Sequence, residues 1–215
     1  MADPAVREAI SRQARAWLAA NALILDTETT GLGDDAEVVE LAVIDCAGAV
    51  LLDTLVRPSG PVPAEAAAIH GITDAMLAGA PTWSEIHARF CGLVEGRQVV
   101  IYSREFDARV ISQTAHRYGL QAPQCFDLAR DDSAVHCAMQ AYAELHGEWS
   151  EEKGRYRWQK LSTAAQQQGV KVENAHRALG DCLMTLGVVR AMANGNISHP
   201  VGRIALRERS TRRTC

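Results

Sequence analysis

The 215-residue sequence lacks an excess of positive charge, because 22 lysine and arginine residues stand against 26 aspartate and glutamate residues, for a formal net charge of −4. This balance excludes a protein that coats nucleic acid by bulk electrostatic attraction, but it leaves room for an enzyme that handles nucleic acid locally. The sequence also lacks any apolar run of membrane-spanning length. Charged residues interrupt the first twenty positions, so we expect no signal peptide there.

The six cysteines lack the spacing of a metal site or a redox motif, since there is no CxxC pair and no zinc-type cluster with histidine. We therefore expect reduced thiols, as in a cytoplasmic protein. Hydrophobic residues make up 47% of the chain and charged residues 22%, which is typical of a soluble globular protein. The sequence has no internal repeat and no linker, so it predicts one domain, with a docking helix at 1–20 and a basic tail at 195–215.

Hydrophobic periodicity predicts how the sheet begins. Residues 1–20 carry an apolar stripe that is typical of an amphipathic helix docked on a domain. Three strand-like runs follow at 23–26, 38–44 and 50–56, and the turns between them indicate consecutive hairpins. The opening of the sheet is therefore predicted to be antiparallel.

After residue 58 the pattern changes to helices that alternate with short strands. One strand is predicted at 98–102 and a further one at 125–128. Helices are predicted at 64–69, 83–94, 105–118, 133–145, 158–168 and 175–193. Trp158 begins one of these helices and is expected to pack in the core. The combination implies a mixed sheet with helices on its faces.

Two acids, Asp26 and Glu28, follow the first apolar run with one residue between them. Side chains alternate along a strand, so both carboxylates extend from the same face. Two carboxylates held together repel each other unless a positive charge lies between them, and a hard divalent cation commonly supplies it. This stretch therefore predicts half of a metal site.

Two further acids stand where they could complete that site. Asp107 is predicted in the first turn of a helix entered directly from a strand, where its carboxylate can face the edge of the sheet. Asp181 lies on the last predicted helix, five residues after His176. That separation takes the histidine off the helical face of the acid unless His176 precedes the first turn and lies on the loop.

Three motifs in this order resemble those of the DEDD exonucleases, in the histidine-containing, DnaQ-like branch that includes proofreading exonucleases. The motifs are Asp26-x-Glu28, Asp107 within a Tyr-x-x-x-Phe-Asp setting, and His176-x-x-x-x-Asp181. The sister branch has a tyrosine four residues before the last acid, where this chain has Arg177. The segment Ile69-His70-Gly71-Ile72-Thr73 is also similar to the family, so the resemblance extends over residues 23–189.

The resemblance implies an RNase H-like fold, with a mixed five-stranded sheet flanked by helices, in an exonuclease domain at 21–194. It also implies two divalent cations, Mg²⁺ or Mn²⁺, and hydrolysis of nucleic acid from the 3′ end to release nucleoside 5′-monophosphates. His176 would be the general base, because the reference pKa of histidine, about 6.5, lies near neutral pH. The metal ligands would be Asp26, Glu28, Asp107 and Asp181, an oxygen-rich set that hard ions select.

In this family the turn after the first two acids lies against the terminal nucleotide. The residues of the chain that match this turn are Thr29, Thr30, Gly31 and Leu32, and Thr27, between the two acids, is a further candidate contact. Leu32 would be an apolar wedge beside the base. His70 would either contact the terminal nucleotide or act as a structural histidine of its own turn.

The chain departs from the family pattern at Ser103 and Arg104, where the family commonly has Asn-Ala. A serine can still form a local hydrogen bond, and Arg104 is a candidate partner for a phosphate. Near the charged loop at 147–157, Trp149, Arg155 and Tyr156 would either lean over a single strand or belong to a solvated loop. The basic tail would either touch phosphates or be a disordered terminus.

The leading hypothesis is a cytoplasmic, metal-dependent 3′-to-5′ exonuclease that acts on single-stranded nucleic acid with a free 3′ end, with DNA favoured. A non-catalytic module of the same fold, binding nucleic acid or a polymerase, would be expected to lose one of the four acids or the histidine. This chain keeps the four acids and the histidine. An exoribonuclease or a proofreading subunit with a polymerase partner is the alternative. Stand-alone action is favoured because only a short basic segment follows the last predicted helix.

Overall fold

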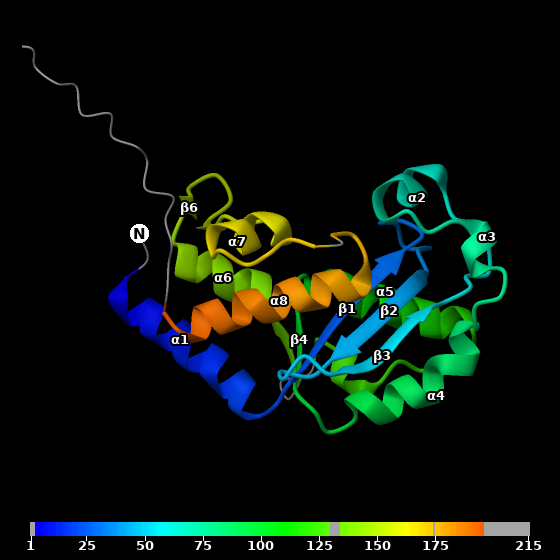
Figure 1. Ribbon diagram of the computed structural model, residues 1–215, viewed down its shortest axis with the longest axis horizontal. Coiled ribbons are helices and arrows are strands. Elements are labelled where there is room, and N and C mark those ends of the chain that lie inside the picture. The colour runs from blue at the N-terminus through cyan, green and yellow to red at the C-terminus, as the bar shows by residue number, and fades with distance from the viewer. Residues whose placement is uncertain (1–2, 130–133, 174, 196–215) are drawn as a thin grey trace, which may run out of the picture.

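The main sheet has five strands in the spatial order β3-β2-β1-β4-β5 (Figure 1). The computed structural model describes residues 3–129, 134–173 and 175–195. β1 pairs antiparallel with β2, and β2 with β3, whereas β4 and β5 continue the sheet parallel to β1. The strands are β1 (Leu23–Thr29), β2 (Val38–Ile44), β3 (Val50–Leu55), β4 (Val99–Ile101) and β5 (Val135–Cys137). The predicted mixed five-stranded sheet with an antiparallel opening is confirmed.

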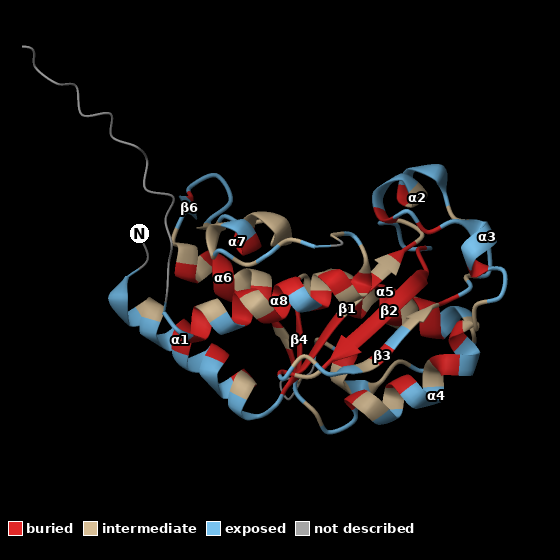
Figure 2. Ribbon diagram, viewed as in Figure 1, coloured by how far each residue is buried: buried red, intermediate tan, exposed pale blue. Residues whose placement is uncertain are grey.

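Apolar side chains place β1 and β2 at the centre of the sheet. All seven residues of β2 are buried, and the first three residues of β1 have no exposed surface. Figure 2 shows β1 and β2 largely buried, while β3 is partly exposed as an edge strand. Strands that are apolar on both faces need a helical layer on each side, and this requirement organises the domain.

The two faces of the sheet carry separate hydrophobic cores. One face is covered by α1 (Pro4–Ala19), α6 (Ala138–His146), α7 (Leu161–Gln167) and α8 (Ala178–Ala193). The other face is covered by α4 (Trp83–Val94) and α5 (Arg104–Arg117). In Figure 1, α8 crosses in front of the sheet and α5 lies behind it. Two short helices, α2 (Ala64–His70) and α3 (Asp74–Leu77), lie near the end of β1.

The N-terminal helix docks on the domain, as the apolar stripe predicts. Asp3 caps α1 by accepting a hydrogen bond from the N–H of Ala5 at 2.7 Å. The buried residues Ile10, Ala14 and Trp17 face α6 and α8. The helix therefore buries its apolar face against the same core that holds α8 in position.

The strand predicted at 125–128 is wrong. Residues Gln124–Phe126 form a 3₁₀ turn, and the ring of Phe126 packs against Phe90 with 5.7 Å between centroids. The fifth strand is instead β5, which lies inside the segment predicted as the helix 133–145, and α6 begins only at Ala138. A three-residue strand is too short to show an alternating pattern, so pairing with β4 decides its conformation.

Other boundaries differ near the charged loop. The segment 147–157 contains a two-stranded hairpin formed by β6 (Trp149–Ser150) and β7 (Arg155–Tyr156). α7 begins at Leu161 rather than at 158, and Trp158 lies before it with 47% of its surface exposed. The predicted core role of Trp158 is therefore wrong. The guanidinium of Arg155 lies over its ring instead, which gives this indole a partner outside the core.

The sequence predicts reduced thiols, and it lacks an apolar run of membrane-spanning length. The five cysteines in the described ranges form no disulfide, and Cys215 lies outside these ranges, as does the basic tail apart from Gly195. Across residues 3–129, 134–173 and 175–195, every helix is too short or too polar to cross a membrane.

Gly187 allows α8 to pack closely against the loop after α7. A Cβ at this position would lie 2.5 Å from Cγ1 of Val170. We predict that Gly187→Ala lowers the free energy of unfolding by about 1–3 kcal/mol through overpacking. The control is Gly92→Ala on α4, where a Cβ would meet nothing within 4 Å, and which we expect to be neutral or stabilising. Urea denaturation checks both, and equal effects would contradict the packing argument.

Candidate functional site

Three carboxylates meet where α8 crosses β1. Asp26 and Glu28 extend from the same face of β1, and Asp181 lies in the first turn of α8. Oxygen atoms of the three side chains all lie within 4.8 Å of one another, and each residue is partly exposed. The predicted half-site on β1 is therefore joined by the acid predicted on the last helix.

Asp107 lies beside this group but is held differently. It is in the first turn of α5, as predicted, and is only 3% exposed. The hydroxyl of Thr27 donates a hydrogen bond to Oδ1 of Asp107 at 2.7 Å. Thr27, which the sequence places against the nucleotide, is thus buried and positions an acid of the site.

The crowding of these acids raises their pKa values. Burial is the largest cause for each, and repulsion from the neighbouring carboxylates adds to it. The pKa is raised to about 8 for Glu28, to about 7 for Asp107 and to about 6 for Asp181, and that of Asp26 is well above its ordinary value. The metal-free site therefore keeps protons at pH values where exposed carboxyl groups are ionised.

Glu40 is a fifth acid near the site, and the sequence analysis missed it. It stands opposite Glu28 in the pairing of β1 with β2 and is 3% exposed. Nε of Arg177 donates to both of its carboxylate oxygens at 3.1 Å, and the N–H of Ala178 donates to Oε2 at 2.8 Å. A single acid inside the apolar run of β2 was the available signal, because a buried charge needs a partner.

His176 precedes α8 by two residues, which confirms its predicted place on the loop. Its φ of 62° lies in the left-handed region, which is rare for a residue with a side chain. Its N–H donates to Oδ1 of Asp181 at 3.2 Å, and the next residue, Arg177, is bound to Glu40. Contacts to two acids therefore hold an unusual backbone conformation and leave the imidazole exposed beside Asp181.

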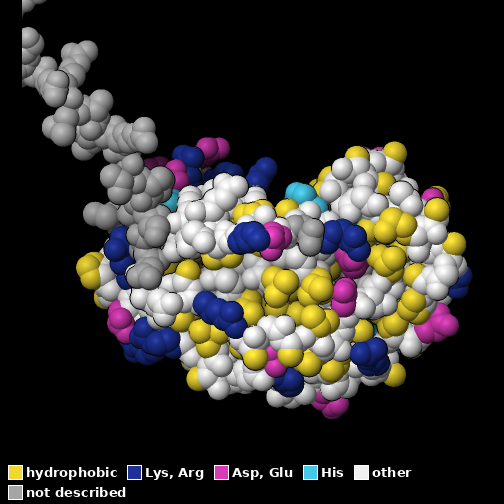
Figure 3. All heavy atoms as spheres, in the orientation of Figure 1, with side chains coloured by type: hydrophobic (Ala, Val, Ile, Leu, Met, Phe, Trp, Pro, Cys, Tyr) yellow, Lys and Arg dark blue, Asp and Glu magenta, His cyan; other side chains and the backbone are white. Residues whose placement is uncertain are grey.

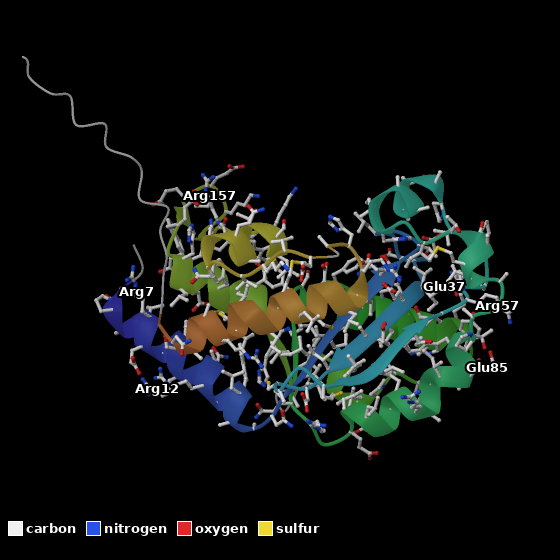
Figure 4. All side chains as sticks on the ribbon, in the orientation of Figure 1. Arg7, Arg12, Glu37, Arg57, Glu85 and Arg157 are labelled. Atoms are coloured by element: carbon white, nitrogen blue, oxygen red, sulfur yellow. The ribbon has the colours of Figure 1, made fainter. Side chains whose placement is uncertain are left out.

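The turn after β1 is fixed by its own polar groups. The hydroxyl of Thr29 donates to the carbonyl of Gly31 at 2.8 Å, and the hydroxyl of Thr30 accepts from the N–H of Glu37 at 2.9 Å. Figure 4 places Glu37 near the ends of β1 and β2. The two threonines predicted to contact the nucleotide are thus also the residues that shape the turn.

Leu32 follows this turn with 81% of its surface exposed, which is unusual for a leucine. Arg109 of α5, a residue that the sequence analysis did not select, donates to the carbonyl of Leu32 and to that of Gly33, both at 3.0 Å. The backbone that carries the exposed side chain is therefore held from α5.

His70 lies at the end of α2 and is 6% exposed. Its Nδ1 accepts a hydrogen bond from the N–H of Ile72 at 3.0 Å, so it does stabilise its own turn. In the described part of the chain, its buried Nε2 has no hydrogen-bond partner. Burial lowers the pKa of His70, while the backbone of Thr29 opposes the shift, so this Nε2 lies near the turn after β1.

The departure at Ser103 and Arg104 does not disturb the start of α5. Ser103 is the N-cap residue, but its side chain makes no capping hydrogen bond. Arg104 donates to Oε1 of Glu105 at 2.8 Å and to the carbonyl of Val135 at 3.4 Å. The guanidinium of Arg104 is therefore engaged by protein groups.

Comparisons with known proteins agree with this geometry. The chain matches the RNase_T family model, described as Exonuclease, over residues 23–189. An uncharacterized exonuclease, CP81 of Escherichia phage 186, is 51% identical over 187 residues, which cover 86% of this chain and 95% of the relative. The chain therefore belongs to the RNase_T exonuclease family, as the DnaQ-like resemblance predicts.

Solved structures show the same fold. Exonuclease X in complex with 5′ overhanging duplex DNA is 26% identical, with a TM-score of 0.58 and coverage of 80% of this chain and 90% of that one. E. coli exonuclease I in complex with a dT13 oligonucleotide is 20% identical, with a TM-score of 0.61 and coverage of 76% and 39%. The sheet order and these likenesses confirm the predicted RNase H-like fold.

The raised pKa values predict how pH acts on the metal-free protein. Glu28, with a pKa of about 8, keeps its proton in the folded state where the unfolded chain has lost it, so stability falls as pH rises from about 4 to 8. At pH 8 in EDTA, Glu28→Gln should raise the unfolding free energy by about 1–2 kcal/mol and Tm by roughly 2–8 °C. Differential scanning fluorimetry checks this against the exposed control Glu65→Gln, and a lower Tm for Glu28→Gln would refute it.

The ion pair between Arg177 and Glu40 predicts a second stability effect. Arg177→Met leaves Glu40 buried opposite Glu28 with a single N–H donor, so we expect a loss of about 1–3 kcal/mol, because the arginine is partly exposed. Lys171→Met, which breaks an exposed pair with Glu173, should change stability by less than about 0.5 kcal/mol. Adding Glu40→Gln to Arg177→Met should recover part of the loss in urea denaturation. Equal stability of the two methionine variants would rule out this role.

Proposed function

We propose that the chain is a metal-dependent 3′-to-5′ exonuclease that hydrolyses single-stranded DNA to nucleoside 5′-monophosphates. The observation that carries the proposal is the group of Asp26, Glu28 and Asp181, whose oxygens lie within 4.8 Å in a member of an exonuclease family. Three neighbouring carboxylates destabilise the fold by their mutual repulsion, and a cation bound between them would remove this repulsion.

The donor set fits hard divalent cations. Every candidate ligand is a carboxylate oxygen, and no cysteine or histidine belongs to the described group, which favours Mg²⁺ or Mn²⁺ over softer metals. We assign Asp26, Glu28 and Asp181 as direct ligands and Asp107 as the fourth acid of a two-ion site. Such ions, when bound, supply a nucleophile from water near neutral pH and stabilise the leaving oxygen.

His176 is the group that we assign as general base. Its imidazole is exposed at the rim of the acidic group, beside Asp181, and it can take the proton of the attacking water. The backbone contacts to Asp181 and, through Arg177, to Glu40 keep the ring at that position. A strained residue held from two sides is a common arrangement at a catalytic site.

The turn after β1 is the proposed seat of the terminal nucleotide. The exposed side chain of Leu32 would lie against the base, and Thr29, Thr30 and Gly31 would shape the backbone around the sugar. His70 contributes Nε2, which carries the ring proton because Nδ1 is an acceptor, and which lies near the backbone of Thr29.

A DNA end is the favoured substrate because the structural relatives named above carry DNA. Exonuclease X is in complex with duplex DNA that has a 5′ overhang, and exonuclease I with dT13. A terminal nucleotide has to leave its stack to reach acids beside β1, which favours a single-stranded 3′ end. The same site could serve RNA, so the test includes it.

The direct test is incubation with 5′-labelled single-stranded DNA, duplex DNA and RNA, each with Mg²⁺, Mn²⁺ or EDTA. We expect a ladder that shortens from the 3′ end, is fastest on single-stranded DNA and requires a metal. Internal cuts, 5′-end release or activity in EDTA would contradict the proposal. Oligonucleotide binding without any hydrolysis would favour the non-catalytic alternative.

The role of His176 has its own prediction. His176→Ala should lower kcat by about 10²–10⁴-fold, because a general base contributes on that order, while Mn²⁺ binding measured by calorimetry stays near normal. His116→Ala, an exposed histidine on α5, is the control and should retain the wild-type rate. Turnover by His176→Ala near the wild-type rate would remove the histidine from the mechanism.

A further inference from the structure

We infer that the β6–β7 hairpin, together with Trp158, is a second binding surface that holds the single strand on the 5′ side of the reacting end. The inference rests on the proposed function, because it names where the rest of the strand lies. The rings, the charges and the attachment of this hairpin support it independently of the acidic group.

The tryptophans of the chain divide into two pairs. Trp17 and Trp83 are 2% and 0% exposed and belong to the hydrophobic cores. Trp149 and Trp158 are 48% and 47% exposed, and both belong to the segment 149–158. Two half-exposed indoles on one short segment are costly on a free surface, and exposed apolar groups that gather together commonly mark a binding site.

The rings are arranged so that faces remain available. Trp149 and Tyr156 meet edge to face, with 5.2 Å between centroids and 85° between planes, which leaves a face of each ring uncovered by the other. The guanidinium of Arg155 lies 3.5 Å over the ring of Trp158. Flat aromatic rings and a flat guanidinium are the groups on which nucleobases stack.

The charges around the rings suit a phosphate backbone. The segment carries Lys153, Arg155 and Arg157, and Lys160 follows it. The acids are Glu148, Glu151 and Glu152. Nε of Arg157 pairs with Glu148 at 3.3 Å, and Lys153 and Lys160 are exposed, as are Glu151 and Glu152. Arg157, labelled in Figure 4, lies at the base of the hairpin, where its backbone N–H donates to the carbonyl of Glu148 at 2.8 Å. Figure 3 shows lysine and arginine side chains together with acidic ones along the same edge.

The segment that follows the hairpin is hydrogen-bonded to the end of β4, the strand that leads into α5 and Asp107. The hydroxyl of Tyr102 donates to the carbonyl of Gln159 at 2.8 Å, next to Trp158. Tyr102 is 6% exposed and follows β4 directly, and α5 with Asp107 begins two residues later. In Figure 1 the hairpin, α7 and the end of β1 lie along one edge of the molecule. A strand whose 3′ end lies at the acids can therefore continue along this edge.

A single strand fits this surface better than a protein partner does. Protein interfaces have a contiguous apolar centre from which charges are depleted. Here the apolar rings alternate with arginine and lysine, as in sequence-tolerant surfaces for single-stranded nucleic acid. The occupant is therefore the substrate strand itself, bound through bases and phosphates without sequence preference.

Binding is tested without catalysis by fluorescence anisotropy of an oligothymidylate of about a dozen nucleotides in EDTA. We expect Trp149→Ala, Trp158→Ala and Arg155→Ala each to weaken binding by about tenfold, a typical loss for one stacked base. Val50→Ala, which removes a side chain that is 52% exposed on β3, is the control and should bind like the wild type. Oligonucleotide binding by the ring variants equal to that of the control would overturn the inference and leave the rings as a protein-docking surface.

A second measurement separates this surface from the acidic site. With Mn²⁺, kcat/KM of the ring variants should fall about tenfold on the same oligonucleotide but stay unchanged on the p-nitrophenyl ester of thymidine 5′-monophosphate, which is too short to reach the hairpin. Unchanged turnover of the ester also shows that the variants are folded. An equal loss on both substrates would overturn the inference. Absence of turnover by the wild type would defeat the proposed function alone, because the anisotropy result does not depend on it.

Discussion

Burial and mutual repulsion both act against the carboxylates that meet at this site. Asp26 and Glu28 share one face of a central strand, and α8 brings Asp181 to the same face. Folding therefore has to bury these carboxyl groups and hold them close together, and the raised pKa values reflect first their burial and then their mutual repulsion. A core buried on both faces of the sheet supplies the free energy for this, and a divalent cation would recover part of it on binding.

Within the described residues, Glu40 is paired with an arginine, whereas Asp26, Glu28, Asp107 and Asp181 form no ion pair. Glu40, directly opposite Glu28, is paired with Arg177 and accepts from the first N–H of α8. This contact fixes the start of the helix that carries Asp181, and with it the backbone of His176. The same buried pair thus acts on charge and on geometry, and the uncompensated acids remain available for cations.

The motifs could be predicted from the sequence because each has a local signature. Strand alternation places Asp26 and Glu28 on one face of the strand. The separation of five residues between His176 and Asp181 places the histidine on the loop before the helix. The role of Glu40 depends on strand register, and β5 depends on pairing with β4, so neither has a local pattern. The predicted core position of Trp158 is wrong for a similar reason. Its partner Arg155 lies in a hairpin that is too short to show periodicity.

The acidic group of the metal-free protein holds protons that a bound cation would displace. Isothermal titration of the metal-free protein with Mn²⁺ at pH 7, repeated in two buffers of different ionisation enthalpy, measures the protons released per ion bound. Because the pKa of Glu28 is about 8 and that of Asp26 is also raised, we expect the release of about one proton or more for each ion bound. Binding without proton release, or no binding, would contradict this expectation.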